Sequence, residues 1–326
     1  MVSWIKWLSK LEKMKSNNPL DEFSLISRYF DKKIKRRKEV FLGIGDDCSL
    51  IKLKSNQLLA QTTDTLVENT HFFPSMPADA VGYKALAVSL SDLAAMGAQP
   101  AHVFLSLTLP KADRQWVQKF CRGFFKLANQ YDVDLIGGNL SRGPLSITVQ
   151  AQGYISKKDI LRRDAAKVGD YIFVSGELGH AGLALRHLRN TETVPKKSLR
   201  SFYYPTPRVA LGMHLRKIAN AAIDISDGLV LDLSHILDAS HVGATLQLDK
   251  VPVAKNAGVR FAITAGEDYE LCFTVSQKNT KKYQLLLRRL GCVCIGQVEK
   301  PPGLRLIDKG GCLLQLSGTG YQHFCA

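Results

Sequence analysis

Residues 83–100, YKALAVSLSDLAAMGAQP, decide the fold of the first half of the chain. Apolar residues recur here at helical spacing and give way to Gly97 and then Pro100, an order typical of a helix end. The pattern predicts a helix over 79–96. Its apolar stripe runs through Val81, Ala85, Val88, Asp92 and Ala95, in steps of 4, 3, 4 and 3. A carboxylate such as Asp92 on that stripe is costly unless it is paired or binds a cation.

Strands and helices alternate on both sides of this helix. Short apolar or alternating runs predict strands at 58–62, 102–109, 133–136 and 145–151, and a second helix over 113–130. After a polar stretch at 157–170 the chain continues with strand 171–174, helices from about 181 and about 207, strand 221–225, helix 229–239, strand 269–275, helix 278–290 and strand 292–298. This order predicts two lobes of the α/β or α+β class, although periodicity does not give the strand order.

The polar stretch at 157–170 is a plausible domain boundary. We therefore predict an N-terminal α/β domain over 20–156, which binds metal and substrate, and a C-terminal α+β domain over 157–326. Residues 1–19 are a basic N-terminal extension whose spacing favours a short amphipathic helix. We expect this extension to be a docking or fraying segment that is dispensable for chemistry, and not a membrane anchor.

The composition favours a globular cytoplasmic protein. Of the 326 residues, 45% are hydrophobic and 22% charged, and no apolar run approaches the roughly 18 residues that a transmembrane helix needs. The N-terminus has no apolar core of the kind found in signal peptides. Seven cysteines without a CxxC pair fit reduced cytosolic thiols. Without an HExxH motif or a His/Cys cluster, any metal should have oxygen ligands, which indicates magnesium or calcium.

The chain is basic, with a formal net charge of +15. Residues 1–40 carry 11 basic and 5 acidic side chains, including the run KKIKRRK at 32–38. Such a run attracts nucleic acid, a membrane surface or phosphorylated substrates, but most charge runs are simply solvated faces. We expect neither a nucleic-acid nor a membrane partner.

The scarce acidic residues gather at turns and strand ends. Besides Asp92 they lie in the glycine turn 43–47, at the end of strand 58–62 and at the strand-to-helix junction 224–228. Like charges that converge require a cation between them, and carboxylate, threonine hydroxyl and water are ligands that magnesium prefers. Each motif alone could be an ordinary turn. Together they favour a magnesium site.

The phosphate-binding signals are unconventional. A GxxxxGK[ST] loop and a dinucleotide fingerprint are both missing, which excludes the two commonest nucleotide-binding motifs. Two glycine loops remain, one at 137–143 after a strand and one at 175–180 between a strand and a helix. Either could present backbone N–H groups to phosphate, or could only turn the chain. Spacing leaves both alternatives open.

Seven segments in order make the chain recognisable. They are EFSLISRYF (22–30), GIGDDCSL (43–50), TTDTLVENTHF (62–72), the stretch 83–100, LIGGNLSRGPLS (135–146), AIDISDGLVLDLSHI (222–236) and AGEDYELCFTV (265–275). Over about 22–324 the chain resembles the thiamine-monophosphate kinase family, in the superfamily of aminoimidazole ribonucleotide synthetase and selenophosphate synthetase. The resemblance implies a two-lobed PurM-like fold, α/β plus α+β, whose N-terminal strands contribute to a dimer barrel.

The same resemblance implies an activity and a set of site residues. The activity is ATP-dependent phosphorylation of thiamine monophosphate to thiamine diphosphate, by direct in-line transfer with several Mg²⁺ ions, in a homodimer. The residues that match magnesium positions are Asp47, Thr63, Asp64, Asp92, Asp224 and Asp227, with Asp46 and Thr62 beside them and Asn139 where the family has an Asp. Gly138, Asn139, Arg163 and Ser226 match ATP-binding positions, and His71, Glu267 and Tyr321 match substrate-binding positions.

These roles agree with elementary chemistry. The acceptor phosphate has a second pKa near 6, so it is already ionised and needs no general base. Several Mg²⁺ ions and Arg163 would neutralise and align two polyanions. The thiazolium cation suits the face of Tyr321, and Glu267 could accept a hydrogen bond from the aminopyrimidine.

Three departures from the family keep alternatives open. The segment 252–265 is short, residues 1–19 are additional, and Asn139 removes one negative charge. The alternatives are another ATP-dependent enzyme of the superfamily, a catalytically weakened relative, or a basic nucleic-acid-binding protein. Two features argue against the first alternative. A selenophosphate synthetase should carry a reactive Cys and a Lys in an N-terminal glycine-rich loop, and the chain has no such loop before residue 43. A hydrogenase-maturation relative should end in a Cys, whereas Cys325 is the penultimate residue here. Against the last, the acidic clusters would repel nucleic-acid phosphates unless metals intervene.

Overall fold

A computed structural model gives the fold of residues 25–31, 37–44, 48–53, 55–316, 318 and 320–321. The extension 1–19 and the predicted ligands Asp46 and Asp47 lie outside these residues. A short π-helical segment, Ile26–Asp31, and the pair β1 (Val40–Leu42) and β2 (Leu50–Ile51) precede the main body. No helix in the described ranges is both long and apolar enough to cross a bilayer.

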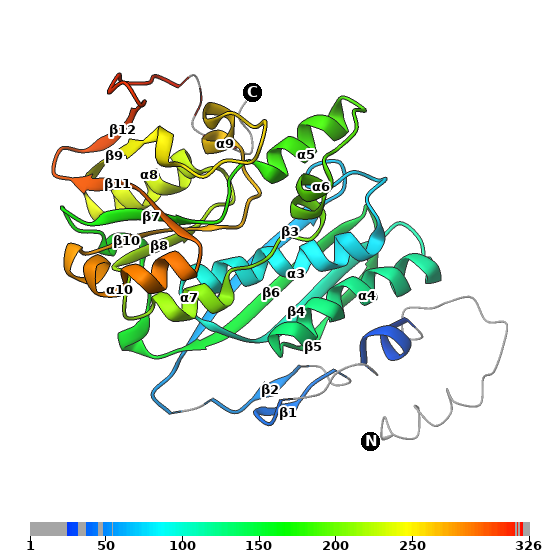
Figure 1. Cartoon of the computed structure of the whole chain (residues 1–326). Helices are drawn as coiled ribbons and strands as arrows, with labels where there is room; N and C mark the ends of the chain where they lie inside the picture. The colour runs from blue at the N-terminus through cyan, green and yellow to red at the C-terminus, as the bar shows by residue number, and fades with distance from the viewer. Residues whose placement is uncertain are drawn as a thin grey trace, which may run out of the picture.

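The N-terminal lobe is a four-stranded sheet with two helices packed on one face (Figure 1). Its strands lie in the order β3 (Leu58–Val67), β6 (Ser146–Ile155), β4 (Gln99–Leu109) and β5 (Asp134–Arg142). Only the β4–β5 pair is parallel. Within the described part of the chain this sheet is open, with β3 and β5 as its edges. The helices are α3 (Ala78–Ala95) and α4 (Arg114–Tyr131).

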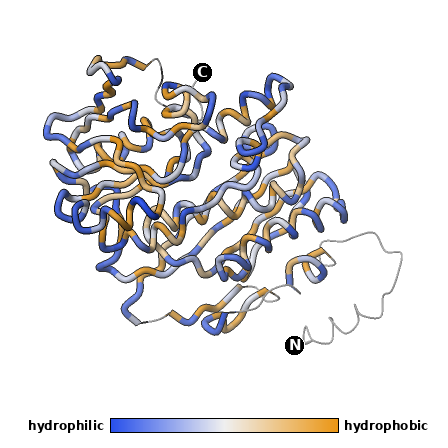
Figure 2. The backbone as a smooth tube through the Cα atoms, viewed as in Figure 1, coloured by the Kyte–Doolittle hydropathy of each residue, from blue (hydrophilic) through white to orange (hydrophobic). Residues whose placement is uncertain are grey.

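The C-terminal lobe is built on a six-stranded mixed sheet. Its order is β12 (Gly303–Ile307), β9 (Gly243–Gln247), β11 (Cys292–Glu299), β7 (Tyr171–Ser175), β10 (Leu271–Val275) and β8 (Ala221–Asp224). The helices are α5 (His180–Arg189), α6 (Lys196–Tyr203), α7 (Val209–Leu215), α8 (Leu229–Ser240), α9 (Val259–Thr264) and α10 (Gln277–Arg289). Apolar residues concentrate along its strands, and polar residues on the outer turns (Figure 2).

Helix α3 joins the two lobes. It packs on α4 and on the N-terminal sheet, and also on β8 and α7 of the C-terminal lobe. The prediction of a single apolar stripe is therefore wrong, because α3 is buried on almost every side. The α3–α4 contact is close: a Cβ at Gly82 would lie 2.2 Å from the Phe120 carbonyl oxygen, and one at Gly123 would lie 1.7 Å from that of Asp79. Only glycine permits this approach.

Most predicted elements are confirmed, but two predictions about strand ends are wrong. Thr62–Asp64 does not end a strand, because β3 continues to Val67. The segment 137–143 is not a loop, because 137–142 forms the body of β5 next to β4. Its glycines mark a close approach, since a Cβ at Gly138 would lie 2.0 Å from the Leu105 carbonyl oxygen. The short elements β9, β12, α6 and α9 were not predicted from the sequence.

Candidate functional site

Three of the predicted magnesium ligands converge where the two lobes meet. Asp64 projects from β3, Asp92 from α3 and Asp224 from the end of β8. A pocket of about 180 Å³ adjoins Asp92 and Asp224 and is also lined by Thr62 and Arg163, among others. The lining residues come from both lobes, so the fold brings together segments that are far apart in the sequence.

Hydroxyl groups hold these carboxylates in place. The bonds run from Ser89 Oγ to Asp64 Oδ2 (2.7 Å), from Ser91 Oγ to Asp224 Oδ2 (2.7 Å) and from Thr62 Oγ1 to Asp92 Oδ2. Ser89 and Ser91 are fully buried and were missed by the sequence analysis. The available signal was two hydroxyl residues inside an otherwise apolar helix, where each requires a partner.

Burial raises the pKa values of all three carboxylates. Burial raises the pKa of Asp224 to about 8, and repulsion from Asp92 adds to this effect. Burial, and then repulsion from Asp92, raises the pKa of Asp64 to about 6. The pKa of Asp92 is also raised by burial, against the opposing effects of its Thr62 bond and the Arg163 charge. A bound cation would reverse these shifts, because it favours the ionised form of each group.

The turn between β8 and α8 places Ser226 and Asp227. Asp232 Oδ2 accepts hydrogen bonds from the N–H groups of Ser226 (3.1 Å), Asp227 (3.1 Å) and Gly228 (3.0 Å). Asp232 is 3% exposed, and burial raises its pKa to about 7. Asp232 was not among the predicted site residues, although it shows the same signal as Asp92, an acid on the buried face of a helix. Asp232 thus fixes the loop that presents Asp227.

The predicted substrate residues gather around the same turn. The backbone N–H of Glu267 donates to the Ser226 carbonyl (2.7 Å), and that of Tyr321 donates to the Asp227 carbonyl (3.0 Å). His71 Nδ1 accepts from the Val67 N–H at 3.0 Å. Lys84 links Glu267 to His71, since its Nζ donates to Glu267 Oε2 (2.5 Å) and to the His71 carbonyl (3.5 Å).

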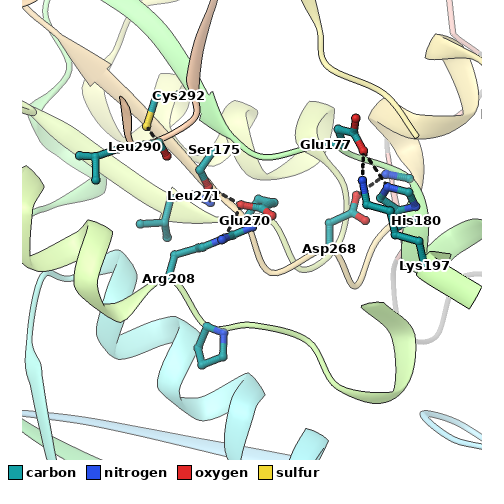
Figure 3. A network of polar contacts seen from close by, with 12 residues as sticks. Ser175, Glu177, His180, Lys197, Arg208, Asp268, Glu270, Leu271, Leu290 and Cys292 are labelled. Carbon is teal, nitrogen blue, oxygen red and sulfur yellow. Dashed lines mark hydrogen bonds and ion pairs between the residues drawn. The ribbon is translucent and has the colours of Figure 1, made fainter. Parts of the chain in front are cut away.

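The segment that carries Glu267 is anchored on its C-terminal side as well (Figure 3). Asp268 Oδ2 accepts from the Gly179 N–H (2.7 Å) at the start of α5, and burial raises the pKa of Asp268 to about 8. The Glu270 carboxylate accepts from both Arg208 Nε (2.7 Å) and Ser175 Oγ (2.5 Å). Burial raises the pKa of Glu270, whereas the Arg208 bonds lower it.

Three predicted site residues lie away from this cluster. The strand pairing puts Thr65, Thr148, Ser106 and Asn139 in one row across the sheet. Asn139 and its neighbour Gly138 are thus on β5, three strand spacings or roughly 14 Å from β3. Thr63 is on β3, but its exposed side chain is on the opposite face from Thr62.

A metal would have to be shared among these groups and the substrate. Among the described residues, no three acidic, histidine or cysteine side chains are placed closely enough to enclose an ion by themselves. The oxygen donors nevertheless suit magnesium, which usually keeps several waters and binds through one or two carboxylates plus phosphate. Asp64, Asp92, Asp224 and Asp227 would hold such ions.

Without divalent cations we expect thermal stability to fall as the pH rises from about 5 to about 8. The pKa values of Asp64, Asp232 and Asp224 are about 6, 7 and 8 in the folded chain, against an ordinary value of 3.8. The unfolded chain therefore loses these protons first, and the free energy of unfolding decreases until all three groups are ionised in the folded state as well. Calorimetry across this pH range checks whether the stability falls as the pH rises.

Added Mg²⁺ should counteract this loss, and it should raise the melting temperature more at pH 8 than at pH 5, because the cation replaces protons. Asp224→Asn should flatten the pH dependence, since it removes the group with the highest of the three pKa values. A metal-free stability that rises over this range would contradict the assignment.

Comparison with known proteins matches both lobes of the chain to known domain families. Residues 45–155 match the AIR synthase related protein N-terminal domain, and residues 167–309 match the AIR synthase related protein C-terminal domain. The thiamine-monophosphate kinase of Salmonella typhimurium is 45% identical over 320 residues, which cover 93% of this chain and 98% of that protein.

Two solved structures share the fold. The crystal structure of thiamine-monophosphate kinase from Stenotrophomonas maltophilia K279a has a TM-score of 0.81 at 41% identity, over 89% of this chain and 97% of that one. The structure of AaThiL complexed with AMPPCP and TMP has a TM-score of 0.75 at 30% identity, over 84% and 89% of the two chains. The motif resemblance and the PurM-like fold are thus confirmed, and the chain belongs to the thiamine-monophosphate kinase family.

Proposed function

We propose that the chain transfers the γ-phosphoryl group of ATP to thiamine monophosphate, giving thiamine diphosphate and ADP. The observation that carries this proposal is the clustering of the Asp64, Asp92 and Asp224 carboxylates where the lobes meet, in a chain that aligns with kinases of this specificity over almost its full length. A similar chain that binds AMPPCP and TMP together supports the same pair of substrates.

Each residue of the site has a role in this transfer. Bound Mg²⁺ ions would neutralise the phosphates of both substrates. Arg163 lines the pocket beside Asp92 and would bind ATP phosphate oxygens through its guanidinium fork. Glu267 would accept a hydrogen bond from the aminopyrimidine, and the ring of Tyr321 would lie against the thiazolium cation.

The transfer needs no proton abstraction and no covalent intermediate on the protein. The attacking group is a phosphate oxygen that is already ionised at neutral pH, so the site needs no general base. We propose direct in-line transfer, in which the chain aligns the acceptor with the γ-phosphorus and neutralises charge. Six cysteines in the described ranges are free thiols, which supports a reducing, cytoplasmic location.

We also propose that the active unit is a homodimer. In one chain Asn139 and Thr63 share the exposed face of the sheet but lie on opposite edge strands, β5 and β3. A closed barrel of two such sheets would place β5 of one protomer beside β3 of its partner. The ATP site would then combine Thr63 of one chain with the partner's Asn139, and Asn139 would keep a carbonyl oxygen for magnesium.

The proposed function is tested by incubating the purified full chain with ATP, Mg²⁺ and thiamine monophosphate, and measuring thiamine diphosphate by chromatography. We expect product only when all three are present. Unphosphorylated thiamine serves as the control acceptor, because it lacks the ionised phosphate that attacks. ATP hydrolysis without thiamine diphosphate would overturn the assignment.

The same assay tests how many metal ions are used. We expect the rate to keep rising with free Mg²⁺ beyond the concentration that converts all ATP to its magnesium complex. The reason is that Asp64, Asp92 and Asp224 carry more negative charge than one ATP-bound ion neutralises, and Asn139 contributes no charge of its own. Titrating free Mg²⁺ at a fixed, saturating concentration of Mg-ATP separates the Mg²⁺ that ATP needs from the additional Mg²⁺ that the site needs. A rate that follows the Mg-ATP complex alone would show that one ion suffices.

A further inference from the structure

A lysine lies completely buried next to the substrate residues. Lys84, on α3, has no exposed surface and is among the largest fully buried side chains of the described chain. Burying an ammonium group is strongly unfavourable unless its charge and its N–H donors are satisfied. An apolar side chain of similar length would fill the same space in the core without this cost, so packing alone does not account for a lysine.

The partners of Lys84 come from three separate segments. Its Nζ donates to Glu267 Oε2 at 2.5 Å and to the His71 carbonyl oxygen at 3.5 Å. It also lies 3.9 Å from the centroid of the Phe202 ring, over the face of the ring. The three N–H donors and the positive charge thus meet a carboxylate, a carbonyl and an aromatic face.

Lys84 contacts the Glu267 carboxylate from the protein interior. Its side chain is 24% exposed, whereas that of Lys84 is 0% exposed, so the ammonium group lies on the protein side and the carboxylate faces outward. Lys84 occupies Oε2. Among the described residues no hydrogen bond to Oε1 is found, which leaves this oxygen available to a ligand.

The backbone of Glu267 is also constrained. Its φ is +68°, in the left-handed region that is unfavourable for a residue with a side chain. A Cβ at Gly266 would lie 2.4 Å from the Ser226 carbonyl oxygen, so the chain passes directly against the turn that carries Asp227. Strain of this kind persists where the surroundings over-determine a residue, and it is common at ligand sites.

We propose that Lys84 is the positioning residue for substrate recognition: it fixes Oε2 of Glu267 so that Oε1 accepts the hydrogen bond of the aminopyrimidine ring. This inference rests on the proposed function, because it takes thiamine monophosphate as the ligand of Glu267. It adds a residue from the N-terminal lobe to the recognition of the substrate base, and it ties that recognition to the helix that carries Asp92.

The test compares Lys84→Met, Glu267→Gln and the double variant. Lys84→Met should raise the KM for thiamine monophosphate roughly 10- to 100-fold, the range expected for a lost charge-assisted hydrogen bond, and change the KM for ATP little. If Lys84 acts through Glu267, the double variant should be no worse than Glu267→Gln alone. The matched control is Lys197→Met, which removes an exposed lysine paired with Glu177 and should behave as wild type.

Several outcomes would overturn the role of Lys84. They are additive effects of the two substitutions, an equal rise in both KM values, or an unchanged KM for thiamine monophosphate. If Lys84→Met does not fold, Lys84→Arg carries the test, since it keeps the charge but not the geometry and should shift only the KM for thiamine monophosphate. A wild-type chain that binds thiamine monophosphate without phosphorylating it would overturn the proposed function, and one that does neither would overturn both.

Discussion

We expect Asp227→Asn to lower the rate of thiamine diphosphate formation by about 100- to 1,000-fold and to leave the metal-free melting temperature unchanged. Asp227 would hold a Mg²⁺ ion that neutralises the transferring phosphoryl group, and losing one such electrostatic contribution typically has an effect of this size. The fold is spared because the turn is built by other groups: Asp232 accepts its three N–H bonds, and Gly228 supplies a φ of +125°. Steady-state rates and thermal unfolding of the same preparation check the loss of rate and the unchanged melting temperature.

The matched control is Asp238→Asn, an acid-to-amide change at an exposed position further along α8. It should leave both the rate and the melting temperature as in wild type. An Asp227→Asn variant with a near-normal rate would remove this residue from the metal set. One that loses its fold would show that its carboxylate is part of the turn and not of the chemistry.

Co-expression of Asp227→Asn with Asn139→Arg should restore about a quarter of wild-type activity, although each variant alone should be nearly inactive. The expectation follows from the sheet order, which puts Asn139 on the edge strand opposite β3. If β5 of one protomer serves the site of its partner, each mixed dimer contains one site with both residues intact. Random pairing makes half of the dimers mixed, and half of their sites are intact. Different affinity tags on the two chains isolate the mixed dimer for assay.

The control pairs Asp227→Asn with Asp92→Asn. Both residues belong to the cluster that one chain builds alone, so every site in that mixed dimer carries one defect and activity should not return. Recovery in the control, or none in the test pair, would contradict a site shared between protomers. Asn139 would then act within its own chain or only shape the strand.

The sequence by itself determined most of the local elements and the family of the protein. Helix α3 was predicted to within one residue at each end, because its 3.6-residue periodicity stops at Gly97 and both signals are local. The placement of Asp224 and Asp227 at a strand-to-helix junction was likewise confirmed. The ordered motifs identified the family.

Tertiary structure alone decided which of these groups meet. Lys84 looks like an ordinary helix lysine in the sequence, yet its partner Glu267 is 183 residues away. Asn139 was predicted in a loop beside the other ligands, whereas strand order places it across the sheet from Asp64. Periodicity reports only the faces of a single element, while strand order and burial arise from packing between segments far apart in the chain. A buried charge can therefore be recognised in the sequence, but its partner is fixed only when the two lobes close around α3.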